Sequence, residues 1–247
     1  MKVLGVIPSR LGSVRLPKKP LRLIAGKPLI QHVYQNVKKA KLLDDLVVAT
    51  DSPEIVRLVQ DFGGEAVLTS PAHASGTERV AEVAQKYKKY DTFVNIQGDE
   101  PLISGSTVDR LLRDFGKEKK ALIGSLYIAK TDLEEYESPN VVKVTLNKQG
   151  YALYFSRSPI PHDRSGKDSS FMKHLGIYIY QRKFLTELPK LKASPLENRE
   201  KLEQLKWLDN GYSIRMIPCR VDSIGVDTEE DVQRVESILQ KKSQVLA

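Results

Sequence analysis

The chain has 247 residues, with 39 Lys and Arg side chains against 31 Asp and Glu, and a formal net charge of +8. Residues 1–43 hold ten of the cations and no acidic residue, so the rest of the chain is slightly negative. A nucleic acid or an acidic lipid surface needs an extended positive field, whereas this surplus belongs to one short segment. The charge pattern therefore favours a compact anionic ligand.

The composition is that of an ordinary globular protein, with 40% hydrophobic and 28% charged residues. The longest stretch without a charged side chain, residues 66–77, is far shorter than the roughly 20 residues that cross a bilayer. Cys219 is the only cysteine, which excludes an internal disulfide and a Cys-rich metal site. We therefore expect no membrane insertion and a cytoplasmic location.

The first half of the chain alternates between strand and helix patterns. A short apolar run at residues 3–7 ends at Pro8 and predicts a buried strand that leads into a loop. Further strands are predicted at 46–49, 66–68 and 92–96, and helices at 28–40, 53–62, 76–87 and 104–115. This alternation predicts an α/β fold with a mostly parallel, doubly wound sheet.

The pattern changes after Ala121. Residues 141–146 and 151–155 flank a turn-like tetrapeptide, which predicts an antiparallel hairpin. Extended segments are predicted at 175–180 and 213–221, one helix at 194–209, and a last helix that begins at Thr228 with Asp231 in a capping box. We expect one domain over residues 1–247, in which residues from about 121 to 220 form a smaller mixed β/α lobe.

The loop after the first predicted strand, residues 8–21, carries Arg10, Arg15, Lys18 and Lys19. In an open parallel sheet, ligands bind beyond the carboxyl ends of the strands, where this loop lies. Arg and Lys are suited to phosphate oxygens. Neither the dinucleotide fingerprint nor the Walker P-loop is present, and a solvated basic loop is the alternative interpretation.

Two acidic positions are candidate Mg²⁺ ligands. Asp99 follows a predicted strand between Gly98 and Pro101, and Asp227 precedes the cap of the last helix. Two carboxylates that share Mg²⁺ with substrate phosphates suit phosphoryl transfer. For Asp99 the alternative is a turn residue, and for the acidic residues after Asp227 it is a helix start.

Other polar clusters are less specific. His73, Ser75 and Gly76 precede a predicted helix, where an anion or base could bind and where N-capping is the alternative. The four His residues lack metal-ligand spacing. Glu200 and Gln204 lie four apart in the helix predicted at 194–209, so they would share a face that could hold a polyhydroxylated substrate or be solvated.

Eight collinear motifs resemble the 3-deoxy-manno-octulosonate (Kdo) cytidylyltransferase family over nearly the whole chain. They are P-x-R-x-x-S-x-R-L-P-x-K-P-L at 8–21, V-A-T-D at 48–51, H-x-S-G-T-E-R at 73–79, N-I-Q-G-D-E-P at 95–101, G-Y-A-L-Y-F-S-R at 150–157, H-L-G-I-Y at 174–178, S-P-L-E-x-x-E-x-L-E-Q-L at 194–205 and V-D-T-x-E-D at 226–231. The resemblance implies a nucleotide-diphospho-sugar transferase-like fold. It also implies transfer of CMP from CTP to the anomeric hydroxyl of Kdo, which releases pyrophosphate in lipopolysaccharide biosynthesis.

The resemblance also implies roles for individual residues. Lys19, Asp99 and Asp227 would be catalytic, with Mg²⁺ on the two carboxylates. Those implied to hold the nucleotide are Arg10, Ser13, Arg15, Lys19, His73, Ser75 and Gly76. Those implied to contact substrate are Arg79, Gln97, Arg157, His174, Tyr178, Glu200 and Gln204. The smaller lobe would bind the sugar and form a homodimer.

Three alternatives remain open at this point. The first is the same reaction on an 8-amino analogue of Kdo, and the second is another sugar nucleotidyltransferase. The third is a basic nucleic-acid-binding domain, whose affinity would fall steeply with salt and which would leave both acidic motifs unexplained. A glycosyltransferase is disfavoured because the first 150 residues contain no D-x-D triplet.

Overall fold

The computed structural model describes residues 2–12, 16–166 and 169–245. It divides into two compact units: unit 1 combines Met1–Asp109 with Ser223–Ala247, and unit 2 is Arg110–Asp222. The C-terminal helix therefore belongs to the same unit as the first strand. None of the described helices is long and apolar enough to cross a membrane.

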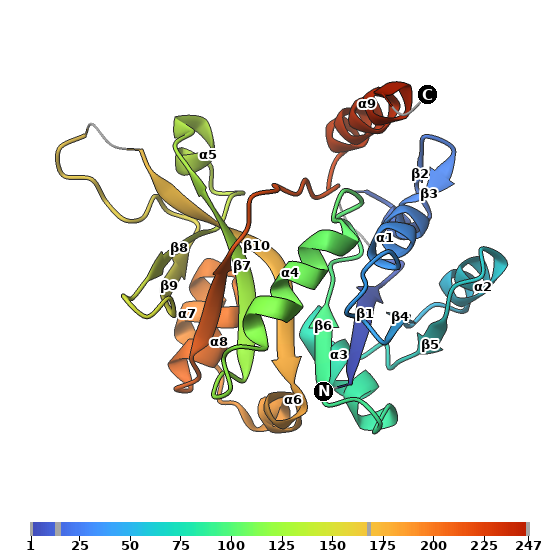
Figure 1. Cartoon of the computed structure of the whole chain (residues 1–247), viewed down its shortest axis with the longest axis horizontal. Helices are drawn as coiled ribbons and strands as arrows, with labels where there is room; N and C mark the ends of the chain where they lie inside the picture. The colour runs from blue at the N-terminus through green and yellow to red at the C-terminus, as the bar shows by residue number, and fades with distance from the viewer. Residues whose placement is uncertain (1, 13–15, 167–168, 246–247) are drawn as a thin grey trace. The chain divides into compact units, whose positions relative to one another are not determined.

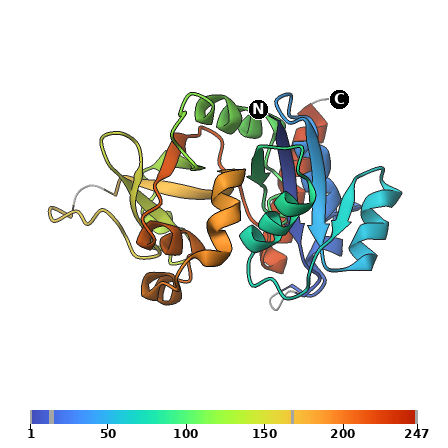
Figure 2. The same cartoon turned by 90° about the horizontal axis from the view of Figure 1, so that it is seen from below.

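Unit 1 is built on four parallel strands in the order β6-β1-β4-β5. They are β1 (Val3–Ser9), β4 (Asp45–Thr50), β5 (Ala66–Leu68) and β6 (Thr92–Asn95). Figure 2 shows β1, β4 and β5 side by side. Four apolar side chains of β1 and four of β4 are buried, as expected for strands covered on both faces. The prediction of a parallel sheet in this part of the chain is confirmed.

Three helices connect these strands: α1 (Leu29–Val37), α2 (Pro53–Asp61) and α3 (Gly76–Lys86). α4 (Gly105–Phe115) follows β6, α9 (Glu229–Val245) is the last helix of the chain, and a short hairpin of β2 (Leu23–Ile24) and β3 (Lys27–Pro28) precedes α1. Side chains cap the helices as their sequences predict. Ser52 accepts from Ile55 N at the start of α2. At α9, Thr228 N donates to Asp231 while Asp231 N donates to the Thr228 hydroxyl, which confirms the capping box.

The order of the strands reverses in the middle of this sheet. The chain runs from β1 to β4 and β5 in one direction and then crosses back to place β6 on the other side of β1. With right-handed crossovers, α1 and α2 cover one face and α3 covers the other. The connections that leave the carboxyl ends of β1 and β6 therefore diverge, which leaves a ligand-sized opening at that point.

Unit 2 is a mixed sheet. Its strands are β7 (Ile123–Lys130), β8 (Lys143–Leu146), β9 (Ala152–Ser156), β10 (Phe171–Gln181) and β11 (Ile214–Pro218). β10 pairs with β7 in the antiparallel sense, β11 pairs with β7 in the parallel sense, and β8 and β9 form the predicted antiparallel hairpin. Figure 1 shows the long β10 beside β7. β7 was not predicted from the sequence, because Gly124 and Ser125 interrupt its apolar run.

The helices of unit 2 include one clear correction. They are α5 (Leu133–Glu137), α6 (Arg182–Glu187), α7 (Pro195–Glu200) and α8 (Glu203–Asp209). The single helix predicted at 194–209 is wrong, because Lys201 adopts a left-handed conformation with φ of 55° and separates α7 from α8. α7 buries none of its residues, whereas α8 buries Leu205 and Trp207. The break thus separates an exposed segment from one that packs into the core.

Aromatic side chains dominate the core of unit 2. The Trp207 indole meets Tyr178, Tyr180 and Phe184 nearly edge to face, with ring centroids 5.1, 5.7 and 5.5 Å apart. Trp207 is 1% exposed. Edge-to-face contacts of this kind add to the area that aromatic rings bury, so Trp207 is the central packing residue of the unit.

We expect Trp207→Ala to lower the free energy of unfolding by about 3–5 kcal/mol, because it leaves a cavity among three aromatic rings. Urea unfolding followed by circular dichroism measures the change. Leu196→Ala, at a side chain that is 38% exposed in α7, is the control and should change stability by less than about 0.5 kcal/mol. Equal effects of the two substitutions would contradict this account of the core.

Candidate active site

A cavity of about 420 Å³ lies at the opening where the strand order of unit 1 reverses. Four parts of the sequence line it: the loop after β1, the segment that begins α3, the loop after β6, and the residue before α9. Its lining residues are Pro8, Ser9, Arg10, Gly12, Lys19, Pro20, His73, Ala74, Ser75, Gly76, Arg79, Gln97, Gly98, Asp99 and Asp227. Most of the side chains that the sequence analysis assigned to nucleotide and metal thus meet in one place.

The loop after β1 supplies the cations of the cavity. Arg10 is exposed and forms no ion pair with any other described residue, so its guanidinium is available for an anion. Lys19 opens a short 3₁₀ turn, Lys19–Leu21, whose Pro20 is buried. Ser13 and Arg15, which were assigned to the nucleotide, lie outside the described residues.

Lys19 lies between the two predicted metal ligands. Its Nζ donates to Asp99 Oδ2 at 2.6 Å and to Asp227 Oδ1 at 2.9 Å, and its side chain is only 17% exposed. Burial acts to lower the pKa of Lys19, but the charges and hydrogen bonds of Asp99 and Asp227 outweigh burial and raise it. Lys19 is therefore a charged ammonium that bonds both carboxylates and offsets one of their two negative charges.

Main-chain contacts bring Asp99 and Asp227 together independently of Lys19. Val226 N donates to the Asp99 carbonyl at 2.8 Å, which joins the two segments. Asp227 N donates to the Asp231 carboxylate at 2.9 Å, which ties Asp227 to the start of α9. Val226 is fully buried in an apolar cluster with Leu29 and other residues from the start of the chain and from α9. The backbone hydrogen bonds and this apolar cluster thus fix the main-chain positions of Asp99 and Asp227.

The donor set fits Mg²⁺. Two carboxylates converge in an open, polar cavity, and Mg²⁺ is usually held by one or two carboxylates together with substrate phosphates and water. Among the described residues, no three acidic, His or Cys side chains form a closed metal site. A divalent ion at Asp99 and Asp227 would thus depend on ligands from outside the protein, as an ion bound with a nucleotide does.

Close packing shapes the floor of the cavity. A Cβ atom on Gly98 would lie 2.9 Å from the Pro8 carbonyl oxygen, so the chain can pass β1 here only as glycine. Nearby, Ser9 Oγ and both polar atoms of the Asn95 side chain are buried without a hydrogen-bond partner among the described residues. Buried polar groups are usually hydrogen-bonded, so these atoms are open to a bound ligand or to water at this opening.

The segment before α3 lies on the other side of the cavity. Ser75 caps α3 by accepting from Glu78 N at 3.2 Å, so the capping interpretation is confirmed for its hydroxyl. Ala74 N donates to the Glu78 carboxylate at 2.8 Å. His73, Ala74, Ser75 and Gly76 all line the cavity, which places the positive end of the α3 dipole at its wall.

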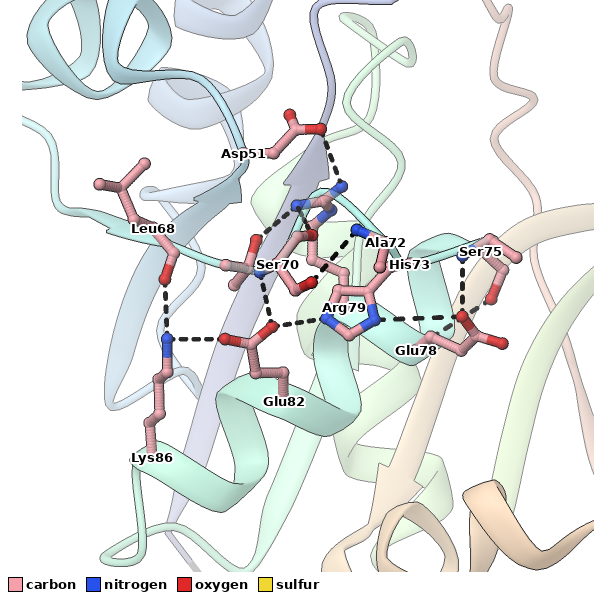
Figure 3. A network of polar contacts seen from close by, with 12 residues as sticks. Asp51, Leu68, Ser70, Ala72, His73, Ser75, Glu78, Arg79, Glu82 and Lys86 are labelled. Atoms are coloured by element: carbon pink, nitrogen blue, oxygen red, sulfur yellow. Dashed lines mark hydrogen bonds and ion pairs between the residues drawn. The ribbon is translucent and has the colours of Figure 1, made fainter.

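Glu82 holds this segment to α3, as Figure 3 shows. Its carboxylate accepts from His73 Nε2 at 2.5 Å, from Ser70 N at 2.8 Å and from Lys86 Nζ at 2.7 Å. Burial acts to raise the pKa of Glu82, but these three donors outweigh it and lower the pKa to about 2. An ionised Glu82 can only accept, so His73 Nε2 carries a proton.

Arg79 is buried behind the same segment (Figure 3). Its guanidinium donates to the Thr69 hydroxyl and, at 3.3 Å, to the Ser70 carbonyl, and it lies 3.5 Å from Asp51 Oδ2. Asp51 and Glu82 were not assigned by the sequence analysis. Asp51 ends the V-A-T-D motif after a predicted strand, a position that could have identified it, whereas no local signal marks Glu82.

Unit 2 contains the remaining substrate candidates except Gln97. Arg157 follows β9, and its Nε donates to the Glu200 carbonyl and one terminal nitrogen to the Pro139 carbonyl, both at 2.9 Å. The Glu200 carboxylate accepts from Arg157 N at 2.9 Å and from the Ser156 hydroxyl at 2.7 Å. Glu200 thus orients the end of β9, and Arg157 keeps one terminal nitrogen without a partner among the described residues.

Lys143 contacts the main chain of Arg157, and no sequence motif indicated this lysine. This lysine is fully buried in β8, and its Nζ donates to the carbonyls of Ser138, Val141 and Arg157. Burial and the neighbouring charge of Arg157 lower the pKa of Lys143, while Glu200 acts to raise it. The ammonium fastens the loop before β8 to the residue that follows β9.

Two other substrate candidates of unit 2, His174 and Tyr178, are buried. His174 is 9% exposed, and burial lowers its pKa to about 3, so it is neutral near pH 7. Its Nε2 is 2.9 Å from Ser125 Oγ, whose hydroxyl points to main-chain carbonyls. The His174 ring packs against Tyr178, which is 3% exposed.

The proposed shared face of Glu200 and Gln204 is a second correction. The two residues belong to different helices, α7 and α8, because of the break at Lys201. Gln204 is 4% exposed and is therefore not part of a solvated helix face.

We expect Glu82→Gln to lower the free energy of unfolding by about 2 kcal/mol near neutral pH, because a neutral amide replaces a carboxylate with three donors. The folded pKa is about 2 and the ordinary value is 4.5, so this contribution is complete above about pH 4.5 and is lost as the pH falls toward 2. Unfolding curves between pH 3 and 8 measure it. The exposed Glu137→Gln is the control, and a difference that grows on acidification would contradict the assignment.

Comparison with known proteins identifies the family of this chain. A family model described as cytidylyltransferase matches residues 4–223. The 3-deoxy-manno-octulosonate cytidylyltransferase of Fusobacterium nucleatum is 45% identical over 98% of this chain and 99% of its own length. The corresponding protein of Geotalea daltonii is 44% identical over 95% of this chain and 97% of its own.

Two solved structures have a similar fold. The structure of CMP:2-keto-3-deoxy-manno-octonic acid synthetase complexed with CTP is 40% identical, with a TM-score of 0.93, and the match covers 98% of this chain and 100% of that one. A putative glucose-1-phosphate thymidylyltransferase from Bacillus anthracis is 17% identical with a TM-score of 0.66 over 96% of this chain and 94% of its own, which shows the shared fold alone. The predicted nucleotide-diphospho-sugar transferase-like α/β fold is thereby confirmed, and the chain belongs to the cytidylyltransferase family.

Proposed function

We propose that this protein transfers CMP from CTP to the anomeric hydroxyl of Kdo and releases pyrophosphate. The observation that carries the proposal is one cavity of unit 1, in which a basic loop, a helix N-terminus and two carboxylates converge. The relatives named for the same reaction are similar to this chain over almost its full length. The sugar acid attacks the α-phosphorus in line with the departing pyrophosphate.

Arg10 and Lys19 are the described cations that take the triphosphate, together with Ser13 and Arg15 from the same loop. Arg10 can bind two phosphate oxygens at once, while Lys19 acts as a point charge. Their role is to stabilise the negative charge that develops on pyrophosphate as it leaves. Each such contact is typically worth on the order of 3 kcal/mol in the transition state.

The cytidine lies against His73, Ser75 and Gly76, with Arg79 behind them. Because Glu82 holds His73 and Ser70, this wall is formed before the nucleotide arrives. A preformed wall costs no ordering entropy on binding. The hydrogen bonds of Arg79 to Thr69 and Ser70 serve the same purpose.

Two groups of residues remain our candidates for the sugar acid, each within its own unit: Gln97 in unit 1, and Arg157, His174, Tyr178, Glu200 and Gln204 in unit 2. The unpartnered terminal nitrogen of Arg157 suits the sugar carboxylate, because an Arg–carboxylate hydrogen bond is charge-assisted. Neutral His174 suits a hydroxyl. Glu200 acts by orienting Arg157, since its own carboxylate is occupied by main-chain and hydroxyl donors.

Mg²⁺ is the ion that we assign to Asp99 and Asp227. When bound, it would polarise phosphate oxygens and lower the pKa of an attacking hydroxyl.

We also propose a homodimer formed through unit 2, for which the mass in solution is the test. We further propose that the reaction takes place in the cytoplasm, since CTP is a cytoplasmic nucleotide.

The 8-amino analogue of Kdo is the second candidate substrate. The names of the similar proteins favour Kdo itself. Pyrophosphate release with CTP, Mg²⁺ and either sugar decides between them, and no release with either sugar would refute the proposed function.

We expect Asp99→Asn to reduce Mg²⁺-dependent pyrophosphate release from CTP and Kdo by at least about a hundredfold, because a neutral amide is a poor ligand for a divalent cation. The exposed Asp61→Asn, at the end of α2, is the matched control and should turn over normally. Near-normal turnover of the Asp99 variant would remove this carboxylate from the chemistry.

We expect Arg157→Gln to raise the KM for Kdo by about tenfold or more, while the KM for CTP changes less than about twofold. The charge-assisted hydrogen bond that it loses is worth about 1.5–3 kcal/mol. Initial rates with each substrate varied in turn measure both constants. Arg199→Gln, at an exposed position of α7, serves as control, and a rise in the KM for CTP alone would argue against a role at the sugar carboxylate.

A further inference from the structure

We propose that Lys19 occupies the place of the divalent cation between Asp99 and Asp227 until nucleotide binds, so that metal and nucleotide enter the site together. This inference rests on the proposed function and adds a binding order to it. The observation behind it is the position of one ammonium within hydrogen-bond distance of both predicted ligands.

The carboxylates do not need Lys19 to be close to each other. The hydrogen bond from Val226 N to the Asp99 carbonyl and the burial of Val226 place both residues at the same wall. Two carboxylates held in this way repel each other unless a cation lies between them. In the absence of metal, the chain supplies that cation from its own loop after β1.

Lys19 is also the kind of group that can leave. Its ammonium is a point charge on a flexible four-carbon stem, and it lines the same cavity as Arg10. Phosphate oxygens in the cavity would offer the ammonium an alternative set of acceptors. The two carboxylates could then accept a divalent ion without any movement of the backbone that carries them.

Charge balance makes the two events depend on each other. If a metal ion entered alone, the Lys19 ammonium would be displaced without an anion to receive it. If the triphosphate entered alone and drew Lys19 away, Asp99 and Asp227 would face it unneutralised. The metal and the triphosphate each remove the electrostatic cost of binding the other. Their binding free energies are therefore coupled, and the coupling acts in both directions.

The test measures the binding of Mn²⁺ to the full chain without nucleotide, using the paramagnetic signal of the ion. Wild type, Lys19→Met and Lys18→Met are compared. Lys18 is the matched control because it immediately precedes Lys19 in the chain. Its side chain is 63% exposed and pairs with Glu54 rather than with Asp99 and Asp227. We expect wild type and the Lys18 variant to bind weakly and alike, and the Lys19 variant to bind at least about tenfold more tightly.

A second variant identifies the site. In Lys19→Met combined with Asp99→Asn, the gain in Mn²⁺ affinity should disappear. The proposal is overturned if Lys19→Met binds Mn²⁺ no more tightly than wild type, or if the gain survives the loss of Asp99. Thermal unfolding gives an independent readout: Lys19→Met should unfold at a lower temperature than wild type, and Mn²⁺ should restore more of the loss than it adds to wild type.

The outcome is separable from the proposed function. Pyrophosphate release by the wild-type protein with CTP, Mg²⁺ and Kdo tests the reaction, and Mn²⁺ binding without nucleotide tests the exchange. An active wild type with unchanged Mn²⁺ affinity in Lys19→Met would overturn the exchange alone. An inactive wild type whose Lys19 variant binds Mn²⁺ tightly would support the exchange and refute the reaction.

Discussion

The reversal of strand order between β1 and β6 is the constraint on which the site of unit 1 depends. Crossover helices lie on opposite faces on the two sides of that point, so the loops that leave β1 and β6 separate and an opening remains. Gly98 allows the second loop to pass within van der Waals distance of Pro8. The basic loop, Asp99 and the N-terminus of α3 meet there because the topology brings three chain connections to one edge.

The positive charge at the start of the sequence is distributed differently in space than along the chain. Arg22 pairs with Glu229 at 2.6 Å and Lys18 with Glu54 at 3.4 Å, so the rest of unit 1 neutralises part of the surplus. Arg10 and Lys19 are the described members of the first 43 residues whose charged side chains line the cavity. A count of charges thus predicted an anionic ligand, whereas the strength of the field depends on which cations the fold leaves without partners.

The sequence predicted the site of unit 1 better than that of unit 2, and the reason is physical. Asp99 could be placed because it follows a strand of a parallel sheet, whose carboxyl end has a known relation to a ligand. Glu200 and Gln204 were placed by helical spacing, which fails when one residue, Lys201, leaves the helical conformation. The position of Glu82 depends on a fold-back of residues 70–73 onto α3, a contact that no local pattern encodes.

The two buried lysines show how the partner of a charge determines what the charge can do. Lys143 donates to three main-chain carbonyls, which cannot take up another ligand without breaking the loop and strand that they belong to, so this ammonium is a fixed part of unit 2. Lys19 donates to two carboxylates, which bind divalent ions at least as well as they bind an ammonium. Exchange is therefore open to Lys19 and closed to Lys143, although both side chains are largely buried and both carry the same group.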